Sequence, residues 1–251
     1  MRVLLILFLL LTFSGPLYLA VTGAIDFSLD FRTANRESAK LAPDAVKSRD
    51  AVVQVYSART FNWRGLFAVH TWIAVKPKND QQYHVYQVVG WRLLHKLPLV
   101  MAEVDIPDRN WFAQTPQILL DIRGAEAEKI IPQIQQAIKT YPYPNQYVYW
   151  PGPNSNTFTA YIAQQVPAMK LALPSNAVGK DFLPPRTFFT TAPSGTGYQL
   201  SYDGIIGLIF ARKEGIEVNI LGLVYGIGFD PLCLKLPGWG DIRLRTKPTT
   251  K

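Results

Sequence analysis

Ser155 and His70 are the two residues of the chain whose types and settings suggest a nucleophile and its general base. Four consecutive residues that favour helix N-caps, 154–157, precede apolar residues at helical spacing and predict a helix that ends near Pro167. The free amides at the start of a helix stabilise negative charge, including the oxyanion of acyl transfer. We therefore expect Ser155 to attack an amide or ester, His70 to accept its proton, and the amides of Ser155 and Asn156 to hold the oxyanion.

A serine–histidine pair needs a third polar residue that orients the histidine, and the strand after His70 offers two. His84 and Gln87 both lie in the sequence YHVYQVVGW, at positions that point to opposite faces of that strand. The register of the hairpin decides which of them faces His70. The further candidates for lining the site are Asn154, Asn156, Trp72 and Trp150.

The same residues also allow simpler interpretations. Capping of the helix is enough to explain residues 154–157, and a histidine within an apolar strand is often a hydrogen-bonded core residue. Asp105 and Asp108 are close enough in sequence to form an acid–base pair, but their setting is more typical of loop and cap residues. The turn at 194–197 is rich in glycine but lacks the lysine of a phosphate-binding loop.

Composition excludes several classes of protein. The chain has 251 residues, of which 48% are hydrophobic and 18% charged, so it is long and apolar enough to fold around a sizeable core. Its single cysteine, Cys233, excludes a disulfide scaffold and a cysteine-based metal cluster. Three scattered histidines argue against a histidine-rich site, and we expect no metal and no cofactor. The 26 basic and 18 acidic residues are spread along the chain, which argues against a nucleic-acid partner.

Residues 1–25 predict a transmembrane anchor or a signal segment. The uncharged run from Val3 to Ile25 is long enough to cross a bilayer as a helix. Residues 22–24 are a weak cleavage site, and Gly15-Pro16 breaks the run halfway, so we favour a retained anchor over a cleaved signal peptide or a buried core helix. Arg2 then stays in the cytoplasm, which predicts a single-pass protein of the inner membrane with its main domain in the periplasm.

The order of the predicted elements indicates an α+β fold with an antiparallel sheet and two main helices. Residues 26–50 are polar and lack periodicity, as a tether does, and residues 51–170 form the core domain. Residues 171–251 are rich in β-forming residues, and we expect them to add strands to the same sheet or to cover the cleft. The predicted strands are 51–57, 64–75, 83–91, 97–104, 205–211 and 216–229, and the predicted helices are 124–141 and 154–167.

The sequence Asn154–Phe158 resembles the Asn-Cys-Asn-His-Phe signature of circularly permuted papain-fold hydrolases. It is also similar to the Asn-Cys helix start of the lecithin retinol acyltransferase group, and His70 resembles the histidine strand of both. The resemblance implies a papain-like core in which histidine precedes the nucleophile. Ser155 stands where these families have cysteine, and serine is the weaker nucleophile at neutral pH.

Several motifs resemble, over residues 30–240, a bacterial family known only as domain of unknown function 3750. The motifs are VHTWIAVKP, VVGWR, RGAEAE, WPGPNSNTFTAYI, GKDFL, APSGTG and EGIEVNILGL. This resemblance implies a membrane-anchored envelope protein and supplies no activity.

Two functions follow as expectations, and a third stays open. The first is hydrolysis or acyl transfer on a wall peptide of peptidoglycan or on a lipid, with Ser155 and His70 as catalytic residues. The second is a non-catalytic envelope binding or scaffold protein that keeps a degenerate papain-like cleft. The third is a structural envelope protein without a cleft.

Overall fold

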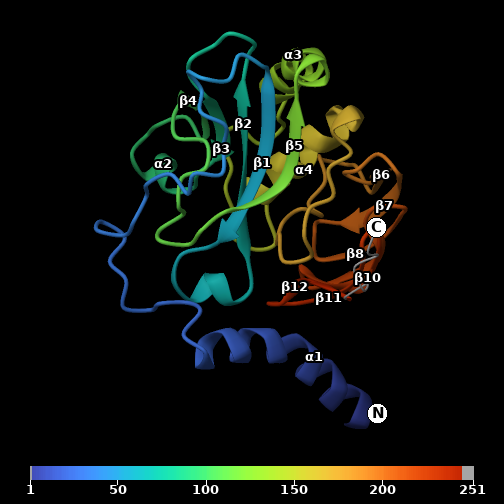
Figure 1. The fold of residues 1–251 in the computed structure, drawn as a ribbon. Coiled ribbons are helices and arrows are strands. Elements are labelled where there is room, and N and C mark those ends of the chain that lie inside the picture. The colour runs from blue at the N-terminus through green and yellow to red at the C-terminus, as the bar shows by residue number, and fades with distance from the viewer. Residues whose placement is uncertain (1, 245–251) are drawn as a thin grey trace, which may run out of the picture.

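Two antiparallel sheets lie side by side in the computed structural model, which describes residues 2–244 (Figure 1). Two main helices pack on the first sheet, and one apolar helix at the N-terminus lies beneath both sheets in this view. The fold is therefore α+β, as the sequence predicts.

The first sheet has five strands in the order β4-β3-β2-β1-β5. The strands are β1 (Val52–Arg59), β2 (Val69–Lys76), β3 (His84–Val88), β4 (Val100–Val104) and β5 (Gln117–Arg123), with the short helices η1 (Asn62–Leu66) and α2 (Trp91–Leu94) between them. The predicted hairpin is the pair β2–β3, in which Ile73 lies opposite Tyr86. Sequence analysis found β1 to β4 and missed β5, which pairs with β1.

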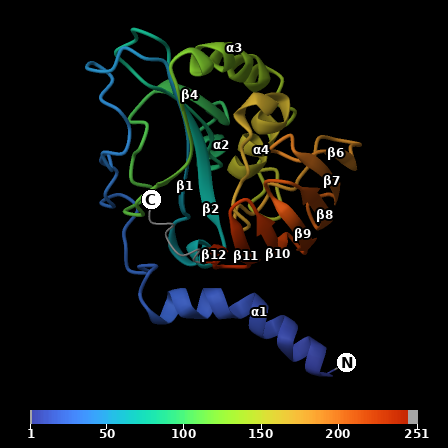
Figure 2. The same cartoon turned by 45° about the vertical axis from the view of Figure 1, so that its right-hand side comes forward.

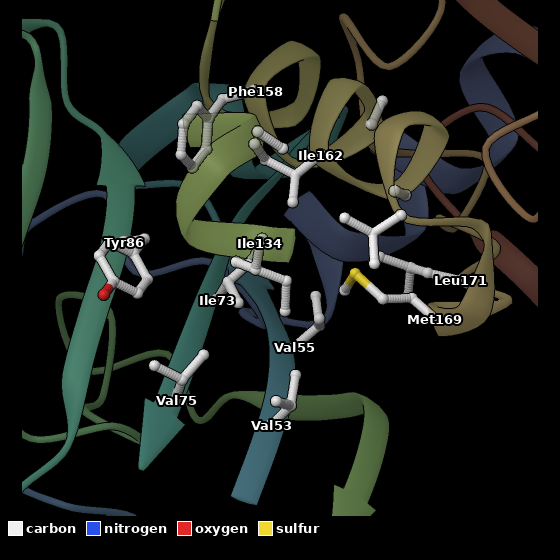
Figure 3. Packing of buried hydrophobic residues seen from close by; sticks show 14 of the residues in the cluster. Val53, Val55, Ile73, Val75, Tyr86, Ile134, Phe158, Ile162, Met169 and Leu171 are labelled. Carbon is white, nitrogen blue, oxygen red and sulfur yellow. The ribbon is translucent and has the colours of Figure 1, made fainter. Parts of the chain in front are cut away.

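Helices α3 (Ala125–Lys139) and α4 (Ser155–Gln165) cover one face of this sheet, and the short helix η2 (Pro167–Met169) follows them (Figure 2). Both main helices lie where the sequence predicts them, and α3 continues through Pro132. Figure 3 shows how Ile134 and Phe158 of the helices meet Ile73 and Val55 of the strands. This buried cluster is the main apolar core of the molecule.

The other face of the first sheet carries a smaller apolar cluster around Tyr56 and Trp72. Residues 38–43 of the predicted tether lie against this side of the molecule. Asp108 fixes them, since its carboxylate accepts hydrogen bonds from the Ser38 hydroxyl at 2.7 Å and from the Ala42 amide at 3.0 Å. Asp108 is thus a loop-fastening residue, in line with the simpler of its two interpretations, and Asp105 forms an ion pair with Arg109.

The second sheet is a meander of seven consecutive strands. They are β6 (Phe189–Thr191), β7 (Gly197–Tyr202), β8 (Ile206–Ala211), β9 (Gly215–Ile220), β10 (Leu223–Phe229), β11 (Leu232–Leu236) and β12 (Gly240–Arg243). The expectation that this region adds strands to the first sheet is wrong. The predicted strand 216–229 is also wrong, because Leu221 and Gly222 both have positive φ, 54° and 77°, and make a two-residue turn that separates β9 from β10.

Helix α1 (Arg2–Val21) is long and apolar enough to cross a membrane. It runs unbroken through Gly15-Pro16, so the predicted interruption is wrong. A Cβ on Gly15 would lie 2.6 Å from the Pro237 carbonyl oxygen, and the glycine therefore lets α1 approach the β11–β12 turn closely. Tyr18 stacks on Trp239 of the same turn, with ring centroids 4.7 Å apart.

Candidate functional site

Asn154 caps α4 with a complete capping box. Its side-chain oxygen accepts hydrogen bonds from the backbone N–H groups of Asn156 at 2.9 Å and Thr157 at 3.3 Å. Its own backbone N–H donates to the Thr157 hydroxyl at 3.0 Å. The backbone N–H of Asn156 therefore already has a hydrogen-bond acceptor, the side chain of Asn154. In this structure the cap that starts the helix occupies the backbone amide to which sequence analysis assigned an oxyanion, and that role stays a prediction.

Asn156 joins the first turn of α4 to β2 and to the loop after η2. Its side-chain nitrogen donates to the carbonyl oxygens of Val69 at 2.9 Å and Val178 at 2.8 Å. Its side-chain oxygen accepts the hydroxyl of Thr71 at 2.9 Å, and that hydroxyl also lies 2.9 Å from the hydroxyl of Thr159. These groups are buried, and each has a protein partner, so they hold the helix to the sheet.

His70 belongs to the opposite face of the sheet. Its ring stacks on Trp111, with centroids 3.7 Å apart and planes inclined by 11°, and Trp72 lies beyond at 5.8 Å. Its Nε2 is 2.8 Å from the Gln87 side-chain oxygen. Burial lowers the pKa of His70 to about 4, with the Gln87 hydrogen bond opposing that shift, so the imidazole is neutral at pH 7.

The structure does not bring His70 and Ser155 together. Side chains alternate along β2, so Thr71 points to α4 while His70 and Trp72 point to the face that Trp111 covers. Within residues 2–244 no hydrogen bond joins His70 to Ser155, which is the first residue of α4. The predicted transfer of the Ser155 proton to His70 is therefore not set up in this arrangement.

Of the two candidates for orienting His70, the hairpin register selects Gln87. His84 lies at the other end of β3, with its Nε2 3.2 Å from the Asp80 carboxylate. The Trp72 indole donates to the Pro107 carbonyl at 2.7 Å, and the Trp150 indole donates to the Leu221 carbonyl at 2.9 Å. Both indoles are thus bonded to backbone. Sequence analysis did not assign Trp111 to the site, because it lies in a loop without the periodicity that would have placed it on His70.

The predicted site has little access to solvent. His70, Gln87 and Ser155 are all buried, as are Asn154 and Asn156. Two shallow hollows open on the surface, one between α3 and the end of α4 and one on the second sheet, and neither is lined by His70 or Ser155. Within the described part of the chain, no group of three or more histidine, cysteine or acidic residues is placed to hold a metal ion.

Residues 50–182 match the model of a family described as protein of unknown function (DUF3750), and the match covers more than half of the chain. The chain belongs to this family. A search of curated proteins found no match, and neither did a search of solved structures. The DUF3750 match spans the first sheet, α3, α4 and all of the predicted site residues, and it ends before β6.

Sequence analysis missed a buried charged cluster that begins at the end of the DUF3750 match. Lys180 Nζ lies 2.8 Å from the Asp181 carboxylate and 2.5 Å from that of Glu217. Lys235 Nζ lies 2.7 Å from the other Glu217 oxygen. Burial would raise the pKa of Glu217, but the two ammonium groups outweigh burial and lower it.

A signal for this cluster was present in the sequence. Lys180 and Asp181 stand in the motif GKDFL, and Glu217 and Lys235 stand at the polar positions of alternating strands. Charged residues in such positions normally face water, so only the three-dimensional structure shows that here they face inward.

Proposed function

We propose that this DUF3750 protein is a membrane-anchored scaffold or binding protein of the bacterial envelope, in which Ser155 and His70 are structural. The observation that carries this proposal is the orientation of β2. Thr71, and not His70, faces the first turn of α4, while Trp111 and Gln87 enclose His70 on the other face. Hydrolysis through Ser155 needs a base beside its hydroxyl, and within residues 2–244 no histidine or acidic side chain forms a hydrogen bond with that hydroxyl.

The contacts of α1 support a retained anchor. A signal peptide that is removed by cleavage does not need close packing against the mature domain. Gly15 and Tyr18 of α1 nevertheless pack closely against the β11–β12 turn. Arg2 is the basic residue at the start of this helix, and basic residues stay on the cytoplasmic side. The proposal therefore places the folded domain in the periplasm, held against the inner membrane.

A second candidate function, amide or ester hydrolysis at a papain-like site, is favoured by one observation. The His70–Gln87 hydrogen bond of 2.8 Å orients a neutral imidazole, as the third member of such a site does. This function requires the first turn of α4 to shift relative to β2, so that Ser155 reaches the imidazole.

The reactivity of a thiol at position 155 separates the two functions. We would make Ser155→Cys in the full chain with Cys233→Ala, which removes the native thiol, and measure its alkylation by iodoacetamide from pH 5 to pH 9. A thiol paired with an imidazole forms a thiolate well below its ordinary pKa of about 8.5. The proposal predicts slow alkylation that rises only towards alkaline pH.

The control carries the same two substitutions together with His70→Ala. The proposal predicts the same pH profile with and without His70. Fast alkylation near pH 6 that is lost in the His70→Ala control would overturn the proposal and establish the papain-like site.

A further inference from the structure

The second sheet has an outer face that is apolar across its strands. Its central row is Leu200, Leu208, Val218 and Tyr225, which lie opposite one another on β7 to β10. We call the side of the sheet that carries this row the outer face. Val218 is 40% exposed although it stands in the middle strand of the sheet. A strand centre in a soluble domain does not normally leave such a residue to water.

The next row of the outer face repeats the pattern without a charged residue. It consists of Tyr198, Phe210, Ile216, Ile227 and Leu234, again opposite one another from β7 to β11. All of these side chains are exposed. A shallow hollow on this face is lined mainly by apolar side chains, among them Leu200, Ile206 and Val218. The apolar area is therefore continuous across neighbouring strands and is not a set of isolated residues.

The inner face of the same sheet carries the polar residues. Glu217 and Asn219 alternate with Val218 on β9, and both are buried. Lys235 on β11 and Gln199 on β7 are buried as well, and they bond to Glu217 and Asp181 respectively. From β6 to β11 the sheet thus buries its charges and exposes apolar side chains, whereas the charged residues of β12 are exposed. This is the polarity of strands in membrane barrels, whose apolar side faces lipid.

Helix α1 is in contact with the outer face. The Thr12 hydroxyl lies 2.7 Å from the Tyr225 hydroxyl, and the rings of Phe8 and Tyr225 are 5.5 Å apart. These contacts come from the middle of α1, whose remaining apolar side chains, such as Leu10, are exposed. Figure 2 shows α1 running beneath β10 to β12. Because the helix and the outer face touch at Tyr225, we expect the medium that surrounds the middle of α1 to reach this face as well.

We propose that the outer face of the second sheet is a membrane-contact surface that rests in the bilayer that α1 enters. The inference rests on the anchor of the proposed function and adds a second element to the membrane contact. Tyrosines such as Tyr198 and Tyr225 suit the boundary between lipid and water. A second copy of the chain is the less suitable occupant, because α1 already occupies part of the face at Tyr225.

Fluorescence quenching at three labelled positions tests this proposal. We would use the full chain with Cys233→Ala and introduce Val218→Cys on the outer face, Leu10→Cys on α1 or Leu94→Cys on α2. Leu94 is 82% exposed and belongs to the first-sheet half of the molecule, so it is the aqueous control. Each variant carries an NBD fluorophore in vesicles of phosphatidylcholine and phosphatidylglycerol, and is quenched by doxyl-labelled lipid or by aqueous iodide.

The proposal predicts that doxyl lipid quenches the labels at positions 218 and 10 several-fold more than the label at position 94, and that iodide shows the reverse order. If the label at position 10 responds to lipid while the label at position 218 responds to iodide as position 94 does, the anchor stands and the contact surface is overturned. Shielding of position 218 from both quenchers would overturn it in favour of a second copy. If lipid quenches neither position 218 nor position 10, the anchor and this inference both fail.

Discussion

The two sheets of this protein follow opposite rules of burial. In the first sheet, Val55 and Ile73 point into the apolar core beneath α3 and α4. In the second sheet, Glu217 and Lys235 point inward as an ion pair, while Val218 points outward. Strands β1 and β2 of the first sheet are buried along their length, both on the helix face and on the face around Tyr56 and Trp72. The strands of the second sheet instead leave one apolar face exposed, and the proposed contact of that face with lipid accounts for the difference.

The polar groups of the two sheets differ in kind as well. Around the start of α4, Thr71 and Asn156 are neutral and bond to each other and to backbone. In the second sheet the buried polar groups include an ionic cluster, in which the carboxylate of Glu217 accepts hydrogen bonds from two lysines. A buried charge left without its partner costs far more than an unpaired hydroxyl, so the second sheet depends more on its polar residues.

The largest effect is expected from Glu217→Ala. This change leaves the ammonium groups of Lys180 and Lys235 buried without their shared acceptor, and we expect it to lower the free energy of unfolding by about 3–5 kcal/mol. Guanidinium denaturation in detergent micelles measures it. Glu37→Ala, which removes an exposed carboxylate, is the control and should stay within about 0.5 kcal/mol of the parent. Equal losses for the two variants would mean that the ionic cluster does not hold the second sheet.

Matched isoleucines give the next largest difference. Ile134 is completely buried in the first core, whereas Ile206 of the outer face is 60% exposed. Ile134→Ala should cost about 2–5 kcal/mol of unfolding free energy, because it leaves a cavity. Ile206→Ala should cost less than about 1 kcal/mol in micelles, because it leaves none. The same denaturation measurement compares them, and a cost for Ile206→Ala as large as that for Ile134→Ala would contradict the contrast between the sheets.

A pH dependence is expected from His70 in the first sheet. Its pKa falls from an ordinary value of 6.5 in the unfolded chain to about 4 in the folded one. Between these values the unfolded chain binds the extra proton, so the stability from this group is complete above pH 6.5 and is lost as the pH falls towards 4. The slope should be about 1.4 kcal/mol per pH unit. Denaturation of the parent and of His70→Gln across this range checks it, and equal slopes would contradict the burial of a neutral imidazole.

The smallest effect is expected at Ser155. Within residues 2–244 its hydroxyl takes part in no hydrogen bond of the first sheet's polar cluster, so Ser155→Ala should change the unfolding free energy by less than about 0.5 kcal/mol. Thr157→Val is the matched comparison, because the Thr157 hydroxyl donates to the Gly179 carbonyl at 2.7 Å. That variant should lose about 1–2 kcal/mol. Thermal denaturation of both variants measures the difference, and a larger loss at Ser155 would show a contact that this account lacks.

Local patterns predicted four of the five strands of the first sheet and both of the helices that cover it. The stripe of Ile130, Ile131 and Ile134 marks α3, and the cap at Asn154 marks the start of α4. The turn at 221–222 was missed because positive φ at Leu221 is unusual for that residue type. The last seven strands pair only with their neighbours in sequence, and that this meander does not join the first sheet depends on tertiary packing, which local periodicity does not encode.

The candidate site was predicted only in part, for a physical reason. Sequence analysis named Gln87 as one of two partners for His70, and the hairpin register then selects it. The face on which His70 lies depends on how α4 packs on β2, and a shift by one residue would have exchanged His70 with Thr71. The sequence likewise did not show that the side chain of Glu217 points inward. A strand with one polar and one apolar side has the same alternating sequence whether its apolar side faces a core or lipid.

Oxygen and nickel-chelate accessibility of nitroxide labels tests the contrast between the sheets most directly. The labels would be placed, in the full chain with Cys233→Ala in lipid vesicles, at Val218 of β9 and at Ile118 of β5, which are 40% and 38% exposed. The account predicts that lipid-soluble oxygen reaches the label at position 218 more than the water-soluble chelate does, and that the order is reversed at position 118. Equal access of the chelate to both positions would contradict it.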